Sequence, residues 1–117
     1  MKTHRDLDAW KLAVELADLI YTVTRDFPSD ERFGLTSQLR RASVSVPANI
    51  AEGAARESSK DYRRFLFIAR GSLAELETLV IIATNADLFT DDQKRTILLA
   101  RNRTAQTLQG LIRSVQT

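Results

Sequence analysis

Five polar side chains share one face of a segment that otherwise follows an apolar helical pattern. Separations of three or four residues place them side by side on an α-helix. These residues are Gln38, Arg41, Ser45, Asn49 and Glu52. One interpretation is a ligand-binding or catalytic site. The interpretation we favour is a structural polar network, with Arg41 paired to Glu52, that fixes helix register or a subunit contact.

Other arrangements with catalytic potential do not occur in the sequence. There is no cysteine, which excludes a thiolate nucleophile, a disulfide framework and a zinc finger. The single histidine, His4, cannot supply the Glu-x-x-His pairs of a di-iron bundle. Glu75 and Glu77 diverge by about 200° on a helix, so they do not form an acid–base pair. We therefore expect no enzyme, no cofactor, no metal ion and no small-molecule substrate.

Basic residues are unevenly distributed along the chain. Residues 90–117 contain five basic side chains, against only two acidic ones, Asp91 and Asp92. Because arginine pairs bidentately with phosphate, this segment is a candidate nucleic-acid-binding face. The candidate residues are Arg95, Arg103 and Arg113, with Arg63 and Arg64 as a second group. The alternative is a solvated face, and the net charge of only +2 excludes a protein that coats polyanions wholesale.

The composition predicts that these side chains are positioned by helices in a single domain, residues 1–117. Apolar residues make up 44% of the chain, and four glycines and two prolines favour long helices over a turn-rich β fold. No secretory signal is visible, and the longest purely apolar run, residues 79–83, is too short to span a membrane. We expect a soluble, cytoplasmic protein with no membrane partner.

Four amphipathic helices are predicted. Pro47 lies inside the second apolar pattern, which keeps its phase, so we expect one kinked helix there. Gly71 lies within the third, where close approach by another backbone would explain it. With short connections, the pattern predicts an all-α, antiparallel up-down-up-down four-helix bundle. The helices run from about Leu7 to Arg25, from Leu35 to Arg56, from the N-cap Ser58 to about Asn85, and from the Thr90 capping box to about Val115.

The first and third helices carry more apolar residues than one bundle core can bury. Leu12, Leu16 and Leu19 form a second apolar stripe on the first helix. Large exposed apolar patches are rare on monomers, so the surplus predicts a homo-oligomer. On the third helix, the residues that fall off the core stripe are Phe67, Ile81 and Ile82.

Several motifs resemble the four-helix-bundle proteins encoded in intervening sequences of bacterial 23S ribosomal RNA genes. The resemblance covers nearly the whole chain, and the Ser-x-Pro-x-Asn-Ile-Ala-Glu-Gly segment is its most specific part. The matching segments are Asp6–Trp10, Phe27–Pro28, Glu31–Leu35, Gln38–Ala42, Ser45–Gly53, Phe65–Leu66 and Ala69–Leu76.

This resemblance implies a homopentameric barrel of bundles with no established enzymatic activity. It also implies kinship with the accessory variability determinants of diversity-generating retroelements, which are basic, pentameric and bind nucleic acid. The present sequence is less basic than that branch. Two functional hypotheses follow. One is an oligomer that binds RNA or DNA through basic helix faces, and the other is a structural or protein-interaction oligomer whose charge serves solubility.

Overall fold

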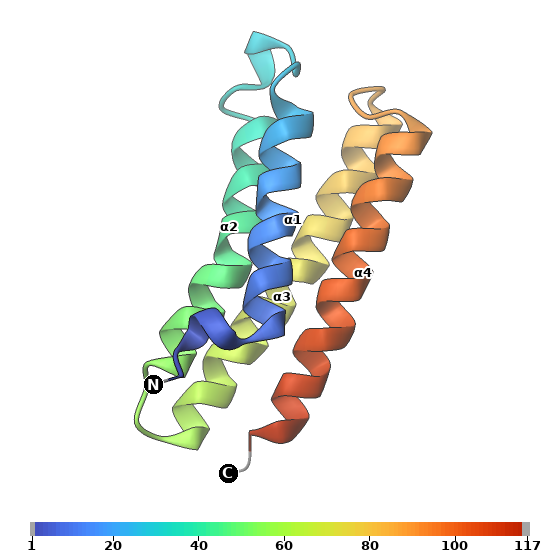
Figure 1. The fold of residues 1–117 in the computed structure, drawn as a ribbon. Coiled ribbons are helices and arrows are strands. Elements are labelled where there is room, and N and C mark those ends of the chain that lie inside the picture. Colours follow the sequence, from blue (N-terminus) through green and yellow to red (C-terminus); the bar gives the residue numbers. More distant parts are fainter. Residues whose placement is uncertain (1, 116–117) are drawn as a thin grey trace.

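The computed structural model describes residues 2–115 and contains four α-helices and, in that range, no β-strand (Figure 1). The predicted all-α class is therefore confirmed. Two short 3-10 helices, η1 (His4–Asp6) and η2 (Ser29–Glu31), precede α1 and α2. No helix in the described range is long and apolar enough to cross a membrane. The four helices are α1 (Asp8–Thr24), α2 (Leu35–Ala54), α3 (Ser59–Asn85) and α4 (Asp91–Ser114).

Local sequence signals explain where the helices begin. The Ser58 hydroxyl accepts a hydrogen bond from the backbone N–H of Asp61 at 3.1 Å, which satisfies one free donor of the first turn of α3. Thr90 and Gln93 form the predicted reciprocal capping box at the start of α4. Helix α2 continues through Pro47 as one helix, as its unbroken apolar stripe indicated.

Each helix packs against two others. α1 contacts α2 and α4, and α3 contacts the same two helices from the other side of the core. The connections α1–α2 and α3–α4 lie at one end of the molecule, whereas both termini and the α2–α3 connection lie at the other (Figure 1). The molecule is elongated along the helix axes, measuring 43 × 24 × 22 Å.

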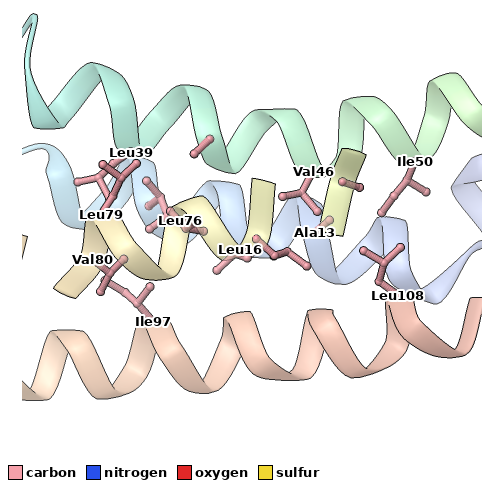
Figure 2. Packing of buried hydrophobic residues seen from close by; sticks show 14 of the residues in the cluster. Ala13, Leu16, Leu39, Val46, Ile50, Leu76, Leu79, Val80, Ile97 and Leu108 are labelled. Carbon is pink, nitrogen blue, oxygen red and sulfur yellow. The ribbon is translucent and has the colours of Figure 1, made fainter. Parts of the chain in front are cut away.

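The core is a continuous column of aliphatic side chains contributed by all four helices (Figure 2). Burying a Leu, Ile or Val side chain stabilises the fold by about 1.5–3 kcal/mol relative to leaving it exposed. Removal of these side chains from water is therefore the main force that holds the helices together. Fully buried members include Ile20, Leu39, Val46, Ile50, Leu66, Leu73, Leu76, Val80, Ile97 and Leu108.

The prediction that α1 carries more apolar residues than the core can bury is wrong for Leu16. Leu16 is only 1% exposed and belongs to the core, and Leu12 and Leu19 are half-buried. The reason is the position of α1 between α2 and α4, which together cover most of its circumference. A charge at position 16 would consequently disrupt the fold of the single chain, not only an assembly.

The surplus of apolar side chains predicted on α3 is present. Phe67 and Ile81 are each 38% exposed, Ile82 is 48% exposed, and the neighbouring Ile68 is 42% exposed. These side chains lie on the outer side of α3, away from the core stripe of that helix.

Within residues 2–115, nothing makes the close approach predicted at Gly71. A Cβ atom at Gly71 would meet nothing within 4 Å. The close approach is instead at Gly53, where a Cβ would lie 2.8 Å from the Cβ of Phe65 and 3.1 Å from the carbonyl oxygen of Tyr62. Gly53 therefore allows the end of α2 to pack tightly on the start of α3. Burial in the same region raises the pKa of the Tyr62 phenol.

Candidate nucleic-acid interface

Part of the polar stripe on α2 joins that helix to α3. The Ser45 hydroxyl lies 2.8 Å from the hydroxyl of Ser72 on α3. The side-chain amide of Asn49 donates to the Ser45 carbonyl at 2.8 Å and to its hydroxyl at 3.0 Å. All three side chains are half-buried or buried, so this cluster positions two helices against each other. The sequence pattern identified Ser45 and Asn49 but missed Ser72, which requires knowledge of the facing helix.

The predicted pairing of Arg41 with Glu52 is wrong. Eleven residues separate them, which is about 16 Å along a helix, and this distance exceeds the reach of the two side chains. Glu52 instead accepts a hydrogen bond from Arg56 at 2.8 Å, one turn away. Arg41 and Gln38 are exposed and line an open hollow that Glu75 also borders. The two ends of the stripe are thus surface residues.

The described part of the chain, residues 2–115, holds no group of three His, Cys, Asp or Glu side chains that could bind a metal ion. His4 packs edge-on against the ring of Trp10, with 5.2 Å between ring centroids.

Three of the basic residues on α4 are close to acids or to another helix. Arg95 pairs with Asp92 at 2.6 Å. Arg101 donates to the Leu73 carbonyl of α3 at 3.1 Å. Arg103 is exposed and lines a hollow that also contains Asp8, Lys11 and Glu15 of α1. The middle of α4 therefore offers an anionic ligand less free positive charge than its composition indicates.

The C-terminal end of α4 is different because it adjoins the N-terminal half of α3. Arg63 donates to the carbonyl oxygens of Ile112 at 2.6 Å and Val115 at 3.0 Å. A cation at this position satisfies free carbonyls and opposes the negative end of the helix dipole. Two turns further along α3, Arg70 lies 3.4 Å from the side-chain carbonyl of Gln109.

Arg113 lies on the same side of α4 as Gln109, because residues four apart share a helix face. Arg113 follows Ile112, whose carbonyl accepts from Arg63, so the structure places Arg113 from the first predicted group at the same end of the bundle as Arg63 and Arg64 from the second. Arg95 lies about 27 Å away along α4. We define the α3–α4 basic patch as Lys60, Arg63, Arg64, Arg70 and Arg113. It lies at the end of the molecule that holds both termini, where α3 is yellow-green and α4 is red (Figure 1).

Within this patch, three side chains are free to meet a ligand. Lys60, Arg64 and Arg113 are exposed, and the closest acid is Asp61, whose carboxylate lies 3.8 Å from Arg64. Exposed ion pairs at that distance contribute little. The sequence analysis missed Lys60 and Arg70. Lys60 and Arg70 lie three to seven residues from Arg63 and Arg64. This spacing places all four side chains on one side of the helix.

Comparisons with known proteins agree with the fold. A family model described as 23S rRNA-intervening sequence protein matches residues 5–110. A solved structure of a protein of unknown function from the S23 ribosomal protein family of Bacteroides thetaiotaomicron is similar, with a TM-score of 0.84. The two chains are 21% identical, and the match covers 91% of this chain and 96% of that one, which establishes likeness of fold alone. The search of curated proteins found no match.

Proposed function

Because the chain belongs to the 23S rRNA-intervening sequence protein family, we propose that it is a self-assembling, non-enzymatic protein that binds RNA or DNA through the α3–α4 basic patch. The observation that carries the proposal is the exposure of Lys60, Arg64 and Arg113 at one end of the bundle, where, among the described residues, the only ion pair that these three make joins Arg64 to Asp61 at 3.8 Å. Lysine and arginine at such positions contact phosphate oxygens and release counterions from the nucleic acid.

The proposal also covers how the four helices are arranged and how copies of the chain assemble. The bundle is antiparallel, up-down-up-down, and five copies form a ring, as the family resemblance implies. The apolar surface of α3 at Ile81 and Ile82 supplies a contact between copies. Symmetry would then repeat the basic patch five times. The protein acts in the cytoplasm, which a chain without cysteine suits. The kinship with retroelement accessory proteins stays a prediction.

Binding is expected to depend on phosphate rather than on base sequence, because backbone contacts position a protein without reading bases. If the patch neutralises about four phosphates, affinity for duplex DNA should fall about 100-fold between about 50 and 200 mM salt. Fluorescence anisotropy with duplex DNA and with structured RNA at the two salt concentrations measures this.

Two variants that each remove three positive charges test which residues bind the nucleic acid. The patch variant, Lys60→Gln with Arg64→Gln and Arg113→Gln, should lose at least ten-fold in affinity at the lower salt. Arg63 is left intact because it caps α4. The control changes Lys94, Arg95 and Arg103 to Gln and should retain most of the affinity. The reverse result would place binding on the middle of α4, and no binding by the wild-type protein would favour the structural-oligomer hypothesis.

A further inference from the structure

The α3–α4 basic patch borders an open hollow that combines positive charge with apolar surface. The hollow is shallow and open, and the five residues that line it all belong to the outer side of α3: Lys60, Arg63, Arg64, Phe67 and Ile68. No acidic residue belongs to this lining. Phe67 and Ile68 are each exposed by about two fifths, at 38% and 42%. A ligand that fits this surface has a flat apolar body and attached negative charge.

The aromatic rings here are covered by guanidinium groups. Arg63 and Arg70 lie over the Phe67 ring, at 5.4 and 4.6 Å from its centroid. On the adjacent Phe65 ring, Arg56 and Arg64 lie at 4.7 and 4.5 Å. Four such contacts fall within residues 56–70. Both rings and guanidinium planes are surfaces on which unpaired bases stack.

The floor of the hollow is held in place before any ligand arrives. Hydrogen bonds to Ile112 and Val115 fix the Arg63 guanidinium, and Phe67 extends from the third turn of a 27-residue helix. Lys60 and Arg64 at the rim are exposed, and Arg64 lies over the Phe65 ring. A fixed stacking surface lowers the entropic cost of binding a base, while the exposed cations at the rim are available to the phosphates on either side.

We propose that this hollow receives an unpaired base of a single-stranded nucleic acid, which stacks on Phe67 in place of the Arg70 guanidinium, with its flanking phosphates held by Lys60 and Arg64. The inference rests on the proposed nucleic-acid function and adds the class of strand. A duplex keeps its bases stacked inside and presents only phosphates and groove edges to such a surface. A second copy of this chain would also cover Phe67, but it would need acidic groups opposite three cations in the same small area.

The test compares one labelled 20-nucleotide strand of mixed sequence with its duplex at constant salt. The wild-type protein should bind the single strand more tightly. Phe67→Leu keeps the apolar volume but removes the stacking ring, so single-strand affinity should fall about 5- to 150-fold, the contribution of one stacked base. Duplex affinity should not change. Phe67→Trp should retain single-strand binding, because indole also stacks. Ile81→Leu, at an equally exposed position on the same helix, is the matched control.

The outcomes separate this inference from the function on which it rests. Equal affinity for the two forms, or unchanged single-strand binding by Phe67→Leu, overturns base stacking and leaves phosphate binding intact. No binding of either form overturns the proposed function itself. Light scattering and thermal melting accompany each variant. If Phe67→Leu melts normally but dissociates the oligomer, a second copy occupies the hollow and the inference fails.

Discussion

Arg63 and Arg101 each donate hydrogen bonds to backbone carbonyls of a neighbouring helix, whereas Lys60, Arg64 and Arg113 extend into solvent. Residues of the same charge thus have different roles, set by what lies across the helix boundary. Removing a fixed arginine leaves carbonyl groups without their partner and weakens the fold. Replacing an exposed cation changes mainly the field that a ligand meets. Binding experiments on this protein therefore require variants of the second kind.

For Tyr62 we predict an effect of pH on the stability of the fold. Its phenol is partly buried against α2, and burial raises its pKa above the ordinary value of 10.0. The unfolded chain therefore releases this proton at a lower pH than the folded chain. Stability from Tyr62 is complete below about pH 10 and is lost as the pH rises toward the raised pKa. The melting temperature should fall over that interval, and Tyr62→Phe should reduce the fall. An equal fall in the variant would assign it to other groups.

Helix pairs in this bundle differ in how closely their backbones approach, and two glycines mark the difference. Gly53 lies where the end of α2 meets the start of α3, with backbone and Cβ atoms in the space that a methyl group would need. Gly110 lies within α4, and a methyl group there would meet nothing within 4 Å. The same substitution should therefore have opposite effects at the two positions.

Gly53→Ala should lower the free energy of unfolding by about 1–3 kcal/mol, the usual cost of overpacking. Gly110→Ala should raise it by up to about 1 kcal/mol, because alanine is the better helix former. Urea denaturation of both variants at one protein concentration measures the difference. Stabilisation by Gly53→Ala would show that α2 and α3 are separated more widely than described here.

The outer side of α3 carries apolar side chains that are exposed in the single chain. Ile81 and Ile82 are exposed there, and Gly71, on the same helix, has no neighbour to explain the loss of about 1 kcal/mol of helix propensity. Assembly of several copies would account for both observations. The contact area lies beyond Arg70 along α3, so it need not cover the basic patch.

Ile82→Glu tests the assembly, because burying an unpaired carboxylate in a subunit contact is strongly unfavourable. Light scattering at micromolar concentration should give an oligomer for the wild type and a mass near the 13.2 kDa of one chain for the variant. Since Ile82 is half-exposed within one bundle, the variant should retain its helical circular dichroism. Thr96→Glu, on the exposed face of α4, should leave the oligomer intact. A monomeric wild type would contradict the assembly.

The helices could be predicted from sequence because their signals are local. Ser58 and the Thr90 capping box act within one turn, and apolar residues at helical spacing identified most of the core, including Leu39, Ile50 and Ile97. The distance along a helix axis is equally local, and it should have excluded a pair between Arg41 and Glu52.

Contacts between helices depended on tertiary structure, because they join residues far apart in the chain. Leu16 is buried because α2 and α4 both cover α1, which an apolar stripe on a single helix cannot reveal. The hydrogen bond from Arg63 to Ile112 spans 49 residues, and no pattern within either helix predicts it. The same packing places Arg113 at the same end of the bundle as Lys60 and Arg64. The sequence alone therefore determined which residues carry charge, whereas helix packing decided which charges share a surface.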